Sequence, residues 1–180
     1  SNILFPYFIN GKLTFLYGNR GYELLVNELI QNSREFNKSL CHLFGIADTV
    51  QLFSLVNSDA LSKDSRRLTG KLFTRKYINL ISPKMRFLYD LIERLDGNIF
   101  IYSSYKKIFI DLFSELLLNE GYQDYSNPER GFDALKRCYM CNATRHAHTS
   151  LSHAWSPKSF LVVDSSNPDL MDAINTYNMS

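Results

Sequence analysis

The spacing of apolar and polar residues predicts a chain that mixes strands and helices. Two β-rich runs, FPYFIN and KLTFLY, flank the turn pair Asn10-Gly11, which is typical of a β-hairpin. Residues 22–45 have the apolar spacing of a helix, with a polar break at Gln31-Asn32-Ser33. Residues 49–56 are expected to form another strand or a short helix.

The stretch from Ser82 to Tyr122 has the pattern of an α/β unit. A helix is predicted to begin at Ser82-Pro83 and to stop at Gly97, because Ser caps helices, Pro suits the first helical position and Gly ends them. The apolar run 98–102 then predicts a strand buried on both faces of a parallel sheet. A second amphipathic helix follows and closes at Gly121.

Three polar residues follow the predicted strand. Ligands of open α/β sheets bind at the carboxyl ends of the strands. A ligand is therefore expected beside Ser103, Ser104 and Lys106. The alternative is a solvated turn between strand and helix.

Composition narrows the class of protein. The 180 residues are 45% hydrophobic and 21% charged, which describes a globular protein rather than a disordered one. The formal net charge of +2 does not by itself predict nucleic-acid binding. No apolar stretch reaches the roughly 20 residues that cross a bilayer, and no signal peptide is recognisable, so we expect no membrane partner. Three cysteines, two of them in one CxxC, argue against a secreted disulfide framework and for a reducing compartment.

The most basic stretch is SRRLTGKLFTRKYI at 65–78, with Phe73 and Tyr77 between the cations. Such a segment can follow a phosphate backbone, although a solvated connecting strand is the better supported interpretation. No Walker A sequence is present, because Gly18-Asn19-Arg20-Gly21 lacks the GK[ST] ending.

Most of the chain's cysteines and histidines fall within sixteen residues, in CYMCNATRHAHTSLSH. Zn²⁺ prefers four Cys or His ligands in a tetrahedron, and CxxC lets two thiolates reach one ion. The expected ligands of a structural zinc are Cys138, Cys141, His148 and His153, with His146 as an alternative to His148. A metal-free loop, a redox CxxC and a catalytic metal site remain open, although HExxH and the HxE of deaminases are absent.

Several segments come in a telling order along the chain: a helix that begins SPK, the strand-like IFIYSS, a helix that ends in Gly-Tyr, and later FLVVD followed by NPDLMDAINTYN. This order resembles the second RecA-like domain of superfamily 2 helicases, in particular the helicase-like ATPases of large cytoplasmic DNA viruses. The resemblance implies an α/β fold with a RecA-like parallel sheet flanked by helices and incomplete at its C-terminal end. Residues 66–180 would be a partial lobe with a Cys/His insertion at about 126–156. Residues 1–65 would be a mixed or mostly helical segment before it, either part of an insertion between the two lobes or the tail of the preceding lobe.

The resemblance also implies a function. The parent protein would be a nucleic-acid-dependent ATPase that uses ATP and Mg²⁺ and acts in viral transcription in the host cytoplasm, at the viral factory or packaged in the virion. Its partners would be DNA, contacted through the backbone by Ser103, Ser104 and Lys106, and a viral RNA polymerase or transcription factor subunit. The motifs for phosphoryl transfer are missing from these 180 residues, so they are expected to be inactive alone.

Two other classes of function remain open. One is a zinc-stapled protein-interaction module without nucleic-acid affinity. The other is a self-contained enzyme with a metal centre at the CxxC and histidines, which would need an open coordination position.

Overall fold

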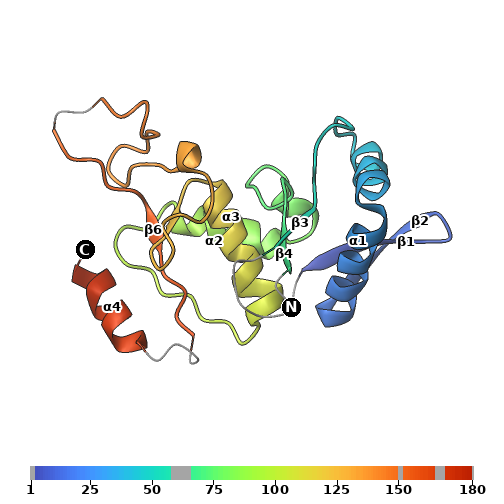
Figure 1. Ribbon diagram of the computed structural model, residues 1–180, viewed down its shortest axis with the longest axis horizontal. Helices are drawn as coiled ribbons and strands as arrows, with labels where there is room; N and C mark the ends of the chain where they lie inside the picture. The colour runs from blue at the N-terminus through green and yellow to red at the C-terminus, as the bar shows by residue number, and fades with distance from the viewer. Residues whose placement is uncertain (1–2, 58–65, 150–151, 165–168, 180) are drawn as a thin grey trace. The chain divides into compact units, whose positions relative to one another are not determined.

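The computed structural model in Figure 1 describes residues 3–57, 66–149, 152–164 and 169–179. The chain divides into two compact units, Ser1–Leu116 and Leu117–Ser180. The boundary predicted from the sequence, between residues 1–65 and a partial lobe at 66–180, is a different kind of division and stays a prediction.

The first unit opens with the predicted hairpin. Strands β1 (Leu4–Ile9) and β2 (Lys12–Tyr17) pair antiparallel along their whole length. Asn10 and Gly11 between them have φ values of 50° and 74°. A two-residue type I′ turn needs two left-handed residues, and Asn-Gly is its preferred sequence, so the hairpin prediction is confirmed.

Helix α1 (Gly18–Leu43) confirms the second prediction, including its interruption. Asn32 leaves the helical conformation, with φ −139° and ψ 39°, inside the predicted polar break. The helix buries one apolar face that comprises Leu25, Leu29, Phe36, Leu40 and Cys41. Its packing on the hairpin includes an edge-to-face contact between Phe36 and Phe8, whose ring centroids lie 5.6 Å apart.

A second hairpin and a capped helix complete the core of this unit. Strands β3 (Ser54–Asn57) and β4 (Arg66–Thr69) pair antiparallel. Helix α2 (Pro83–Ile92) begins as predicted, because the Ser82 Oγ accepts a hydrogen bond from the Met85 N–H at 3.2 Å. The predicted end at Gly97 is wrong: the helix ends at Ile92, with Glu93 as its C-cap. Phe73 is fully buried and packs against Phe53, so this ring of the basic stretch 65–78 belongs to the core and does not face a phosphate backbone.

The prediction of a strand at 98–102 is wrong. These residues form no strand, and Phe100 and Tyr102 are 84% and 80% exposed. A parallel strand is stabilised by hydrogen bonds to strands beside it and by cover on both faces. No strand among the described residues pairs with this segment, so its apolar composition alone does not make it one.

The second helix of the predicted unit exists but begins irregularly. Lys106–Asp111 form a π-helical turn, in which the Ile110 N–H donates to the Tyr105 carbonyl. Helix α3 (Leu112–Asn119) continues it. Gly121 ends the helix as predicted, with φ 97°.

The second unit has little regular structure. Strands β5 (Gln123–Asp124) and β6 (Ser159–Phe160) pair parallel, and helix α4 (Leu170–Met179) contacts this region through Tyr177. The Tyr177 hydroxyl donates to the Ser159 carbonyl at 3.0 Å, and its ring meets Tyr125 edge-on. Residues 161–164 of the predicted strand FLVVD are not in a strand, and the expected helix start at Pro168 lies outside the described residues.

The fold class is therefore mixed α/β, but the expected RecA-like parallel sheet is not found in the described part of the chain. The three sheets there have two strands each, and only the β5–β6 pair is parallel. No helix of the described residues is long and apolar enough to cross a membrane.

Candidate metal centre

A small backbone framework holds the Cys/His segment, residues 137–158, which we call the knuckle. The Cys138 N–H donates to the Ala143 carbonyl at 2.8 Å, and the Asn142 N–H donates back to Cys138 at 2.9 Å. On the other side, the Tyr139 N–H donates to the Ser156 carbonyl and the Lys158 N–H to Arg137. Asn142 turns the chain with a φ of 59°, a conformation that Asn tolerates better than most residues. Cys138 is thereby fixed between two neighbouring segments.

The framework brings four potential ligand atoms together. They come from Cys138, Cys141, His148 and His153, and all lie within 4.8 Å of one another. The Cys138 Sγ is 3.4 Å from the His153 Nε2, which in turn is 3.1 Å from the His148 Nε2. This is the set that the sequence predicted first, while the alternative ligand His146 is exposed and outside the group.

These distances suit a tetrahedral zinc. With Zn–S near 2.3 Å and Zn–N near 2.0 Å, a tetrahedron places S and N about 3.6 Å apart and two N atoms about 3.3 Å apart. The separations from Cys138 to His153 and from His153 to His148 lie within a few tenths of an ångström of these values, and the whole group of ligand atoms lies within 4.8 Å. An ion held by all four groups has no open position, which fits a structural rather than a catalytic metal.

Neighbouring side chains orient the histidines. The Ser152 Oγ lies 3.2 Å from the His153 Nδ1, so the Nε2 of that ring is left to face the cluster. The ring of Trp155 meets His148 edge-on, with centroids 5.6 Å apart. A metal-binding histidine commonly has its second ring nitrogen held by a hydrogen bond, as the Ser152 hydroxyl holds the Nδ1 of His153.

The surroundings of Cys138 favour its thiolate form. Burial on its own raises the pKa of this thiol, but the backbone N–H groups of Ser156, Cys141 and Met140, together with His153, outweigh it and lower the pKa to about 6. Zinc binds thiolates, so these donors favour the ligating form at neutral pH. Cys41 differs: its buried Sγ donates to the Val50 carbonyl, and burial, with Asp48, raises its pKa.

The residues predicted to contact a nucleic-acid backbone do not end a strand. Ser103 is half-buried, and its Oγ accepts from the Tyr105 N–H at 3.1 Å. Ser104 is exposed, and Lys106 is the exposed first residue of the π-helical turn. All three precede a helix, but the strand on which the expectation depended is absent.

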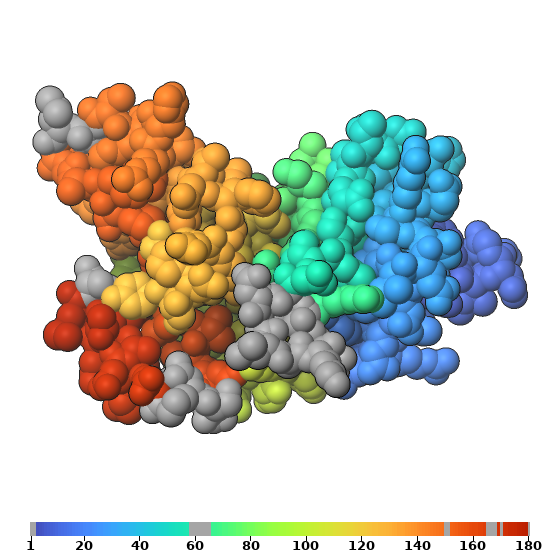
Figure 2. Space-filling view, in the orientation of Figure 1, coloured from blue at the N-terminus to red at the C-terminus, as the bar shows by residue number. Residues whose placement is uncertain are grey.

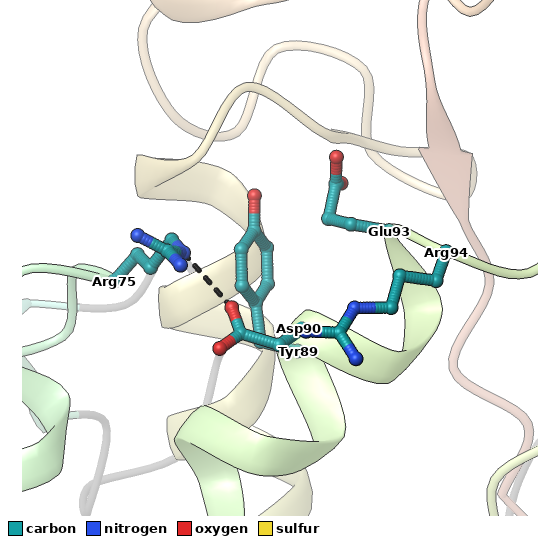
Figure 3. A pocket seen from close by; sticks show the side chains of 5 residues that line it. All are labelled: Arg75, Tyr89, Asp90, Glu93 and Arg94. Atoms are coloured by element: carbon teal, nitrogen blue, oxygen red, sulfur yellow. Dashed lines mark hydrogen bonds and ion pairs between the residues drawn. The ribbon is translucent and has the colours of Figure 1, made fainter.

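A cluster of charged residues on α2 was not foreseen. The Asp90 carboxylate accepts hydrogen bonds from the Arg75 Nε at 2.8 Å and from the Arg86 Nε at 3.0 Å, each on a different oxygen. Figure 3 shows Arg75 facing Asp90 beside the Tyr89 ring, at a hollow that Glu93 and Arg94 also line. The i,i+4 spacing of Arg86 and Asp90 is visible in the sequence, whereas the approach of Arg75 is not.

Comparison with known proteins gives one distant relative to report. The chain is 25% identical over 175 residues to a protein of Acanthamoeba polyphaga mimivirus whose name describes an ATP-dependent RNA helicase. The alignment covers 88% of this chain but 15% of that protein. No protein-family model and no solved structure matches the chain. The chain is thus distantly related to a viral helicase-like protein and spans a small part of its length.

Proposed function

We propose that this chain is part of a viral, helicase-like ATPase that acts on nucleic acid, and that the knuckle in it is stapled by one structural zinc. The distant similarity to the mimivirus protein supports the first half. The approach of four ligand atoms to within 4.8 Å supports the second and is the observation that carries the proposal. Among the described residues of the knuckle, Cys138 is the one buried apolar side chain, so a metal would supply the missing stability.

Metal content tests the centre directly. Purified under reducing conditions without chelator, the chain should contain one zinc, and Cys138→Ser should lose it, because a hydroxyl does not replace a thiolate ligand. His146→Ala is the matched control: it removes a histidine of the same loop that lies outside the cluster, and it should keep the zinc. Equal metal loss in both variants, or no metal in the parent chain, would contradict the proposal.

Finer assignments follow from the sequence resemblance. Residues 66–180 would belong to the second RecA-like lobe of a protein similar to the small subunit of the poxvirus early transcription factor. Strands that pair with residues 98–102 would then come from other parts of the parent protein. ATP and Mg²⁺ would bind where the parent carries its phosphate loop, so the 180-residue chain is expected to show no ATPase activity.

The resemblance also bears on location and partners. The parent would work in the host cytoplasm, with a viral RNA polymerase or transcription factor subunit as partner. The mimivirus relative is named for RNA, whereas the sequence resemblance implies DNA, so both nucleic acids belong in every binding test.

Ser103, Ser104 and Lys106 are the proposed contacts to the nucleic-acid backbone. Hydroxyls and an ammonium group before a helix can bind phosphates, and π-helical turns are frequent at functional sites. Lys106→Ala should weaken binding about equally for all sequences and reduce the salt dependence. Lys12→Ala, an exposed lysine of the first hairpin, is the control, and a sequence-selective loss with Lys106→Ala would refute backbone contact.

A protein-interaction module is the second candidate. Phe132, Tyr139 and Met140 are between 58% and 71% exposed in the second unit, as an interface would require. This function predicts no nucleic-acid binding at any ionic strength, whereas the helicase-like function predicts affinity that falls as salt rises.

A further inference from the structure

The turn inside the CxxC presents large side chains to solvent. Tyr139 and Met140, the two residues between the proposed ligands, are 58% and 65% exposed. The backbone bonds of Cys138 and Tyr139 are already used within the knuckle, so the turn is fixed while its side chains remain outside. Figure 2 shows the knuckle as a whole, in orange, on the face drawn.

The charge around this turn has one sign. Residues 137–158 contain Arg137, Arg145 and Lys158 but no Asp or Glu, although the whole chain has 18 acidic residues. The remaining residues carry 17 cations and 18 carboxylates, so the positive charge of the chain lies on the knuckle. A zinc ion with two thiolates is neutral, so a bound metal does not alter this sum.

Two acidic residues that precede the knuckle, Asp124 and Asp133, have cationic partners outside it. The Asp133 carboxylate pairs with Lys136, which also donates to the Pro128 carbonyl, and Arg145 adds to the effect that lowers the pKa of Asp133. The Asp124 carboxylate forms an ion pair with Arg130 and accepts hydrogen bonds from two backbone N–H groups. Arg145 is exposed, whereas Arg137 holds the turn by donating to the Asn142 carbonyl at 3.0 Å.

From this combination we infer that the knuckle binds single-stranded nucleic acid, with a base stacked on Tyr139 beside Met140 and a phosphate on Arg145. An exposed aromatic on a rigid turn offers a stacking face, and a segment that has cations and no carboxylates of its own attracts a phosphate backbone. A protein partner would use the same aromatics, but the net positive charge of residues 137–158 favours a polyanion. The inference rests on the metal centre proposed above and assigns it a ligand surface separate from Lys106.

The test uses the zinc-loaded 180-residue chain and fluorescein-labelled, mixed-sequence single strands of RNA and of DNA, titrated by fluorescence anisotropy. Tyr139→Ala should raise Kd about 5- to 150-fold, the range expected when one base loses an aromatic partner. Tyr139→Phe keeps the ring and should stay within about twofold. Tyr17→Ala, which removes a 73% exposed tyrosine from the first unit, should leave Kd unchanged.

Arg145→Ala is a second, independent variant. Titrations between about 50 and about 200 mM salt should show a slope of log K against log salt that is shallower by about 0.7, the value of one phosphate contact on a single strand. Zinc content, and emission from Trp155 packed on His148, should remain as in the parent chain for both variants. A duplex of the same sequence should bind more weakly, because its bases cannot stack on Tyr139.

The outcomes separate this inference from the proposed function. If the chain keeps its zinc and Lys106→Ala weakens binding while Tyr139→Ala and Arg145→Ala do not, the knuckle surface is not the binding site and the helicase-like proposal stands. If the zinc-loaded chain binds neither oligonucleotide at low salt, the inference fails, and a protein partner becomes the better explanation of the exposed aromatics. If no zinc is present, the metal centre on which it rests fails first.

Discussion

At the scale of single residues, Asn37 joins two parts of the first unit. Its buried side chain donates to the Phe53 carbonyl at 2.9 Å and accepts from the Phe53 N–H at 2.7 Å. This amide satisfies both backbone groups of a buried residue, as a neighbouring strand would. The same side chain donates to the Ser33 carbonyl, beside the kink of α1 at Asn32.

Asn37→Ala should lower the free energy of unfolding by about 1–3 kcal/mol, because the Phe53 N–H would be left buried without an acceptor. Urea denaturation followed by far-UV circular dichroism measures this. Gln51→Ala is the control: its amide also donates to the Phe53 carbonyl, but at 3.2 Å and in a less buried position, so its loss should cost less. Equal costs would show that the buried amide has no special role.

Asp90 gives the first unit a pH dependence. Burial on its own raises the pKa of this carboxyl, but hydrogen bonds and charges from Arg75 and Arg86 outweigh it and lower the pKa. Asp90→Asn should therefore cost about 1 kcal/mol at neutral pH. The difference should be complete above the ordinary carboxyl pKa of about 3.9 and vanish as pH falls through the lower folded-state value. Denaturation of both proteins across acidic pH checks this, and a pH-independent difference would contradict it.

At the scale of elements, Gly97 and Gly121 both follow a helix with a left-handed backbone, but glycine is favoured at each for a different reason. Gly97, after α2, has φ 85° and open space around it, so only backbone conformation favours glycine. Gly121, after α3, has φ 97°, and an added Cβ would lie 2.6 Å from the Leu135 carbonyl oxygen. Its own carbonyl accepts from the Arg137 N–H, which begins the knuckle.

Gly97→Ala should lower the free energy of unfolding by about 1 kcal/mol, the usual cost of placing a residue with a Cβ in a left-handed conformation. Gly121→Ala should cost clearly more, because the methyl group also displaces the backbone that carries Arg137. The two variants should therefore differ in zinc affinity as well as in urea midpoint, with only Gly121→Ala weakening the metal. Identical effects in both would mean that the contact with Leu135 is relieved without consequence.

The sequence predicted elements where the signal is local. Asn10-Gly11 and the Ser82 cap each act within a few residues, and the hairpin and the start of α2 formed as expected. The Cys and His residues that converge were recognisable because few other roles concentrate these residue types in sixteen positions. Residues 98–102 failed because a strand requires partners, and Asn37 and Arg75 were missed because their partners lie 16 and 15 residues away.

At the scale of the whole molecule, the two units differ in how they are stabilised. Of the described apolar residues that are buried, all but Leu117, Leu118 and Cys138 belong to the first unit. A small unit with so few buried apolar side chains usually needs a disulfide or a metal. The second unit should therefore depend on zinc, and the first should not.

Removal of zinc with EDTA should raise amide hydrogen exchange in peptides from 123–149 and 152–164 and leave those from 18–43 unchanged. Exchange is carried out on the intact chain. Mass spectrometry of its peptides after digestion then measures the exchange of both sets of peptides in one experiment. Cys138→Ser should reproduce the pattern without chelator, and His146→Ala should not. A uniform increase along the chain would show that the metal stabilises more than its own unit.

The uncovered segment 98–102 has a consequence for the chain in solution. Ile99, Phe100 and Tyr102 form an uncharged run with high β-propensity, and their backbone has no strand partner among the described residues. Such runs pair with copies of themselves, and a charge within them prevents it. At high concentration the chain should therefore self-associate and scatter light, and Phe100→Lys should keep it monodisperse with its helices intact.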